Sequence, residues 1–191
     1  MRWLLLHARS RQVPTSAAAV MLVALALWAL DRGSGKHSAS LGTAALVLTA
    51  NVAASSVGLG WQDAALDRTA AIRWLPRRAV HVLLIGAVAA LALLAVQAAG
   101  PELAPTALVV RDSAGLVGLA ALGAVLCGAP FAWALPTGWL GYTLLAPPLG
   151  GTAGQVASWM ISPPGTSASS WTAWALLASG TVLYATTGAR R

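Results

Sequence analysis

The feature that most constrains this chain is the length of its stretches without a charged residue. The longest runs from Ser113 to Ala189, 77 residues without Lys, Arg, Asp or Glu. Charged residues make up 9% of the chain and hydrophobic residues 58%, whereas an ordinary soluble domain is about 25% charged. So few charges cannot cover the surface of a soluble domain, and so apolar a chain is not disordered. The sequence therefore indicates a polytopic membrane protein.

The apolar stretches leave room for six membrane-spanning helices. A spanning helix needs about 20 apolar residues, and these runs lack the apolar–polar alternation of β-barrel strands. We therefore predict one all-α transmembrane domain over residues 1–191. Its predicted spans are Ser16–Leu30, Ala39–Gly60, Ala79–Gly100, Ser113–Gly128, Phe131–Ala146 and Trp171–Gly188. Cys127–Pro130 is expected to break the chain between spans four and five, with Cys127 as a buried, inert thiol.

The basic residues indicate which side of the membrane each loop occupies. With six spans and the N-terminus inside, nine arginines fall in cytoplasmic segments, against two arginines and one lysine outside. Cytoplasmic loops are expected to carry such an excess. We therefore place the protein in the plasma membrane with both termini in the cytoplasm, and the net charge of +7 does not indicate a nucleic-acid partner. A signal peptide over the first 30 residues is the alternative for span one, and the bulky segment Leu27–Leu30 argues against it.

The loop between spans two and three has the charge pattern of a short cytoplasmic helix. Asp63 is placed to cap it, and Asp67 lies near its positive end. Arg73 lies in the last turn, where a cation suits the helix dipole, and Pro76 is expected to stop the helix after Leu75. A merely solvated, basic loop is an equally good interpretation.

Two further segments are expected to lie at the membrane surface or partly within it. Met1–Val13 mixes Trp and Leu with Arg, which slightly favours an interfacial helix over a basic tail. Pro147–Ser170 is too apolar for a free loop, so we expect short re-entrant or interfacial helices there. The domain thus divides into the interfacial helix (1–13), spans one and two (16–60), a cytoplasmic loop (61–78), spans three to five (79–146), an outer segment (147–170) and the last span with a basic tail (171–191).

Polar residues are rare within the predicted spans, and no charged residue is expected at mid-depth. Asn51 and Ser55 share one face of span two, which must contact protein or a polar cavity because lipid offers no hydrogen bonds. Helix–helix packing is the favoured role, and lining of a transport path is the alternative. Small residues in span four, such as Gly118, permit close helix packing.

Sequence motifs for catalysis are missing. The chain has no GxxxxGK[ST] phosphate-binding loop, no HExxH and no GxSxG. Its single cysteine and three histidines offer no metal-binding pattern. We therefore expect no enzymatic activity, cofactor or metal in this chain.

This arrangement resembles the membrane subunits of ABC-2-type transporters, which have an N-terminal interfacial helix, six spans, a cytoplasmic coupling helix and re-entrant helices before the last span. Met1–Val13, Asp63–Leu75 and Pro147–Ser170 match those three places in order. The string Asp67–Ala71 with the arginines that follow it, and the stretch Arg111–Ala120, are similar to those of small actinobacterial, Streptomyces-type permeases. Relative to that family the chain is short, as are spans four and five.

The resemblance implies a permease subunit of a transporter, an exporter rather than an importer. The subunit would work with a separate ATP-hydrolysing subunit and with a second permease half, identical or not. It places the contact with the ATPase on Asp63, Asp67, Arg68 and Arg73, and makes Asn51 and Ser55 weak candidates for the path. The alternative function is a structural or regulatory membrane protein that binds a cytoplasmic partner. A membrane enzyme acting on lipid is disfavoured because polar residues do not cluster in a catalytic pattern.

Overall fold

A computed structural model describes residues 41–56, 59, 74–99, 102–147 and 149–190, and every regular element in this part of the chain is a helix. The all-α fold class is thereby confirmed for the described residues. The Met1–Val13 segment, the first predicted span and residues 61–73 of the cytoplasmic loop lie outside them. The elements are α3 (Leu41–Ser56), α5 (Trp74–Ala99), α6 (Thr106–Leu126), the 3-10 turn η2 (Ala129–Phe131), α7 (Ala134–Leu145), α8 (Gly151–Ala157) and α9 (Ser167–Thr187).

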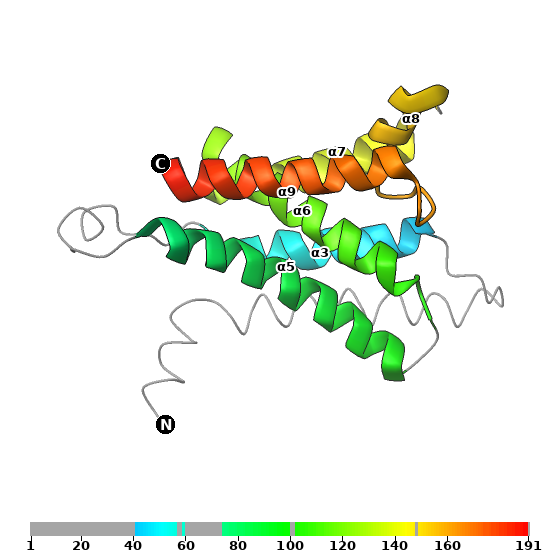
Figure 1. Ribbon diagram of the computed structural model, residues 1–191, viewed down its shortest axis with the longest axis horizontal. Helices are drawn as coiled ribbons and strands as arrows, with labels where there is room; N and C mark the ends of the chain where they lie inside the picture. Colours follow the sequence, from blue (N-terminus) through cyan, green and yellow to red (C-terminus); the bar gives the residue numbers. More distant parts are fainter. Residues whose placement is uncertain (1–40, 57–58, 60–73, 100–101, 148, 191) are drawn as a thin grey trace.

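The helices form a bundle in which α3, α6 and α9 run in one direction and α5 and α7 in the other (Figure 1). Helix α6 is more buried than α5, the other long apolar helix. Helix α9 lies along one side of α6, and α3 and α5 also pack against α6. The Tyr184 hydroxyl of α9 donates to the Leu59 carbonyl, 2.9 Å away. This bond joins the last turns of α9 to the chain just after α3.

Among the described residues, two helices are long and apolar enough to cross a membrane, namely Trp74–Ala98 and Thr106–Leu126. They differ in burial, because most of α6 is enclosed by its neighbours whereas most of α5 is exposed. The exposed side chains along α5 are large and apolar, such as Leu84 and Leu91. Helix α3 is a shorter apolar helix, and α9 has 21 residues.

Two prolines lie in the first turns of helices, and one of them had been expected to stop a helix. Helix α5 begins at Trp74 rather than Ala79 and includes Pro76 as its third residue. Pro136 is likewise the third residue of α7. The N–H groups of a first turn have no partner within the helix, so a proline there removes no hydrogen bond. The prediction that Pro76 ends a helix after Leu75 is therefore wrong.

The break between α6 and α7 is confirmed, although the state of its cysteine differs from expectation. Helix α6 ends at Leu126, and Gly128 adopts a φ of 98°, a conformation that glycine tolerates without steric cost. Cys127 is exposed rather than buried. The cause is that it follows the last turn of α6, where the chain leaves the bundle.

Helices α6 and α9 approach each other through glycines. A Cβ added to Gly118 would collide with the backbone of Leu176 and Leu177, and one added to Gly180 would collide with the carbonyl of Gly118. Close approach of two helix backbones is the arrangement that small residues permit in membrane proteins. The small-residue pattern of span four therefore serves packing within the chain at this position.

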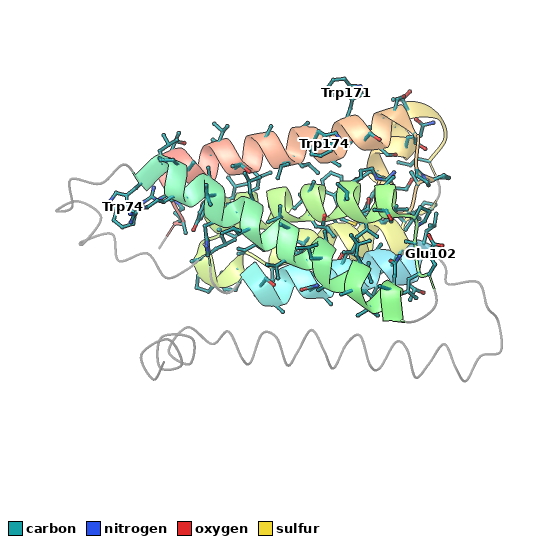
Figure 2. The ribbon with its side chains drawn as sticks, turned by 60° about the horizontal axis from the view of Figure 1, so that its bottom comes forward. Trp74, Glu102, Trp171 and Trp174 are labelled. Atoms are coloured by element: carbon teal, nitrogen blue, oxygen red, sulfur yellow. The ribbon has the colours of Figure 1, made fainter. Side chains whose placement is uncertain are left out.

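The two ends of the bundle differ in charge. One end, here called the arginine end, comprises residues 74–78, 124–134 and 184–190 and carries Arg77, Arg78 and Arg190. The opposite end, here called the α8 end, comprises residues 97–112 and 143–170. Its one exposed charge among the described residues is Glu102. Figure 2 shows Trp74 and Glu102 at opposite ends of the molecule.

Candidate functional site

A buried pair of charged residues stands at the α8 end of the bundle. Arg111 and Asp112 are the sixth and seventh residues of α6, with 5% and 0% of their surface exposed. Span four had been predicted to begin only at Ser113, which left both residues in a loop. The start predicted for this span is therefore wrong, since α6 begins at Thr106, and the pair lies in the first third of the helix rather than at mid-depth.

Arg111 binds four acceptors. Its Nε donates to Asp112 Oδ1 at 2.8 Å. Its Nη2 donates to the carbonyls of Trp159 and Ser162 at 2.8 and 3.0 Å, and Nη1 donates to the carbonyl of Pro163 at 3.3 Å. We call these five residues the Arg111 cluster. The planar guanidinium, with five N–H donors, suits such a set of converging oxygens, and the adjacent carboxylate balances its charge.

The carbonyls in this cluster belong to the chain that leaves α8. Helix α8 has only seven residues, so the carbonyls that follow it have few helical partners. A carbonyl buried without a partner is costly, and a buried arginine without acceptors costs more. Arg111 and the turn after α8 therefore satisfy each other, and α6 holds this turn in place.

Trp159 fixes the same turn by packing. Its side chain is completely buried, and its indole ring lies so close to Gly115 that an added Cβ would collide with it. On the other side, the Trp139 Nε1 of α7 donates to the Ala157 carbonyl at 3.0 Å. The Ser169 hydroxyl of α9 donates to the Gln155 carbonyl at 3.1 Å. Helix α8 is thus tied to α7 and α9, and the turn that follows it to α6.

Two buried polar atoms of the Arg111 cluster have no hydrogen-bond partner, namely Asp112 Oδ2 and Trp159 Nε1. Most buried polar atoms in folded proteins are paired, so these two are exceptions. The described residues contain no group of three His, Cys, Asp or Glu side chains that could hold a metal ion. The hydrogen bonds of Arg111 give the cluster the geometry of a structural clasp between α6 and the turn after α8.

The predicted polar face of span two is found in α3. Asn51 is 4% exposed, and its Nδ2 donates to the Ala89 carbonyl of α5 at 3.3 Å. The bond joins two helices, as the helix–helix packing interpretation requires. Ser55 is half-buried on the same helix.

The remaining predicted site residues lie in the loop before α5. Asp63, Asp67, Arg68 and Arg73 all fall outside the described residues, so the predicted contact with an ATPase stays a prediction.

An open hollow of about 590 Å³ lies between α7 and α8. Trp139, Tyr142 and Val156 are among the residues that line it. The lining is almost entirely apolar and presents no charged side chain.

Sequence reasoning missed the Arg111 cluster because its members are far apart in the chain. Arg111 was counted as an outer-loop residue, and Trp159 was treated only as a sign that its segment is apolar. An Arg–Asp pair directly before a long charge-free run is the one local signal for such a clasp. Its acceptors lie about 50 residues further on, at Trp159, Ser162 and Pro163.

Compared with known proteins, the chain matches no protein-family model, no curated protein and no solved structure. The class of protein therefore rests on the fold. In the part of the chain that the structure describes, this fold is an all-helical bundle with two helices long and apolar enough to cross a membrane.

Proposed function

We propose that this chain is the six-span membrane subunit of an ABC-type exporter, driven by ATP hydrolysis in a separate subunit. One observation carries the proposal. It is the combination, in a single apolar bundle, of an arginine end with a short α8 segment clasped at the opposite end just before the last helix. Because α8 and α9 are consecutive, this placement agrees with the segment expected before the last span of such a permease.

The charge asymmetry supports insertion in a membrane with the arginine end in the cytoplasm. Arg77, Arg78 and Arg190 lie at that end, and the one exposed charge at the other end, among the described residues, is acidic. An excess of basic residues is typical of the cytoplasmic side. Exposed Trp171 and Trp174 are the fifth and eighth residues of α9, in the half of the helix nearer the α8 end (Figure 2). Tryptophans are typical of the interfacial part of a spanning helix.

The hydroxyl groups of the helices also support a lipid environment. Most Ser and Thr side chains donate to the carbonyl three or four residues earlier in their own helix. On the exposed face of α9, Ser179 donates to Ala175 at 2.7 Å and Thr186 to Val182 at 2.9 Å. Such bonds allow a polar side chain to face hydrocarbon without water.

The decisive experiment tests the partner. The full chain with an affinity tag is purified from native membranes in mild detergent, and the copurifying proteins are identified. We expect an ATPase subunit to copurify, and Asp67→Ala/Arg68→Ala to reduce its recovery without lowering the amount of chain in the membrane. Charged residues at such a contact fix its orientation and register.

Glu102→Ala is the matched control, because Glu102 is an exposed charge at the opposite end of the bundle. It should leave recovery unchanged. Equal recovery of the ATPase subunit with the wild type and with the Asp67/Arg68 variant would show that these two residues do not form the contact. A copurified cytoplasmic partner that lacks ATPase activity would favour the structural or regulatory function instead.

A further inference from the structure

The arginine end gathers cations on two helices that are far apart in sequence. Arg77 and Arg78 lie in the first turns of α5, and Arg190 follows the end of α9. The guanidinium of Arg78 lies 3.0 to 3.2 Å from where a Cβ on Gly188 would stand. The first turn of α5 and the tail of α9 therefore meet at one corner of the bundle.

The tail at this corner is held by the bundle. The N–H of Arg190 donates to the Ala124 carbonyl at 3.0 Å, and the carbonyl of Arg190 accepts from the N–H of Ala129 at 3.1 Å. These two bonds fix the backbone of Arg190 against the end of α6. The backbone position from which the exposed Arg190 side chain extends is therefore defined.

Arg77 is similarly positioned, by an aromatic ring. Its guanidinium carbon lies 5.8 Å from the centroid of the Trp74 ring, within the range of a cation–π interaction. Both Arg77 and Arg190 are exposed, while Arg78 has an interaction of its own. No acidic residue lies in the first turn of α5, and the described acidic residues, Glu102 and Asp112, are both at the opposite end.

Exposed apolar side chains follow these cations along both helices. Val80, Leu83 and Leu84 are exposed on α5, and Val182 and Leu183 are exposed on α9. A ligand that fits this corner therefore has an anionic head for the arginines and long apolar chains for the helix surfaces. Guanidinium groups bind phosphate through paired N–H donors, and tryptophan favours the headgroup level of a bilayer.

We propose that the corner formed by Trp74, Arg77 and Arg190 binds the phosphate headgroup of an anionic phospholipid of the inner leaflet. The inference rests on the membrane insertion that is part of the proposed function, and it needs neither the ATPase partner nor transport. The lipid would lie with its headgroup between the start of α5 and the tail of α9, and its chains along the apolar faces of both helices.

The test uses the full chain, purified in detergent and titrated with single phospholipids, with bound lipid counted by native mass spectrometry. We expect phosphatidylglycerol to bind more tightly than phosphatidylcholine. Arg77→Gln and Arg190→Gln should each weaken phosphatidylglycerol binding about fivefold, because each arginine near anionic lipid contributes on the order of 1 kcal/mol. Binding of phosphatidylcholine should not change.

Lys36→Gln is the matched control, since it removes one positive charge from a loop that the sequence predicts on the outer side. It should leave phosphatidylglycerol binding unchanged. Equal binding of the two lipids by the wild type, or an equal loss in the Lys36 variant, would overturn the site and reduce it to a general charge effect. Glycerol 3-phosphate, which lacks acyl chains, should not displace the lipid, and displacement by it would make this a site for soluble phosphate.

A separate measurement distinguishes failure of this site from failure of the proposed function. Alkaline carbonate washing of membranes should leave the chain in the pellet. Release into the supernatant would refute membrane insertion, and the lipid site with it. Retention together with no preference for phosphatidylglycerol would refute the lipid site alone.

Discussion

Arg111 illustrates how a charged residue becomes part of an apolar bundle. Four oxygen atoms surround its guanidinium, one from Asp112 and three from the turn after α8. An intramembrane arginine is expensive unless it is paired and hydrogen-bonded in this way. The cluster also makes the turn dependent on α6, because removal of the side chain leaves the carbonyls of Trp159 and Ser162 and a buried carboxyl group without this donor. The Pro163 carbonyl still accepts from Thr166.

We predict that Arg111→Met destabilises the protein by about 3 to 5 kcal/mol, the usual cost of removing one partner of a buried ion pair. The free energy of unfolding in mixed detergent micelles is the measurement. Glu102→Met, which removes an exposed charge near the same end, should change it by less than about 1 kcal/mol. An Arg111 variant as stable as the Glu102 control would show that the clasp contributes nothing to the fold.

Asn51 provides a smaller, interhelical contribution. We predict that Asn51→Leu lowers the free energy of unfolding by about 1 kcal/mol, because it removes the hydrogen bond from α3 to the Ala89 carbonyl of α5. Ser55→Ala, on the same helix, should have little effect in the same unfolding assay. Full stability of the Asn51 variant combined with impaired transport would instead favour the path-lining role.

The role of a single residue could be predicted where it depends only on neighbouring residues in the sequence. Asn51 was expected to face protein or a polar cavity because lipid cannot satisfy its amide, and it binds a neighbouring helix. Arg111 was misplaced because charges were assigned to loops. Arg111 can lie inside a helix because its acceptors are carbonyls about 50 residues further along the chain. A pattern of neighbouring residues does not reveal such partners.

Between elements, the packing of α6 on α9 depends on backbone contact. Gly118 and Gly180 face each other so closely that neither leaves room for a Cβ. Gly138 of α7 provides the matched contrast, because an added Cβ there meets nothing within 4 Å. Both Gly118 and Gly138 lie inside helices, so their substitution by alanine has the same effect on intrinsic helix propensity.

We therefore predict opposite effects for the same substitution at these two positions. Gly118→Ala should destabilise the protein by about 1 to 3 kcal/mol through overpacking. Gly138→Ala should be neutral or stabilising by up to about 1 kcal/mol, the helix propensity difference between the residues. Thermal unfolding in detergent compares the two variants, and a stable Gly118 variant would contradict the close contact between α6 and α9.

The existence of the helices could be predicted from the sequence more readily than their limits. The break at Cys127–Pro130 was placed correctly, because a glycine and a proline interrupt an apolar run there. The starts of α5, α6 and α9 were placed several residues too late. For α5 the reason was Pro76, which a first turn accepts, and for α6 it was the pair Arg111–Asp112, which the cluster neutralises.

For the whole molecule, the charge asymmetry gives an orientation that can be tested with the native cysteine. Cys127 is the single cysteine of the chain, it is exposed, and it lies at the arginine end between the two contacts that fix Arg190. An exposed thiol is accessible to alkylation. If the arginine end is cytoplasmic, only a reagent on that side of the membrane reaches it.

We predict that a membrane-impermeant maleimide labels Cys127 in inside-out membrane vesicles and fails to label it in intact cells, because the basic end of a membrane protein stays on the cytoplasmic side. The variant Cys127→Ser/Leu149→Cys should reverse this result, since Leu149 is exposed and lies between α7 and α8 at the opposite end. A permeant maleimide should label the wild type and the variant in intact cells, which would confirm that both thiols are reactive. Labelling of Cys127 from outside intact cells would show that the arginine end faces the exterior. An ATPase subunit and the anionic lipid of the inner leaflet would then have to reach the protein at the α8 end instead.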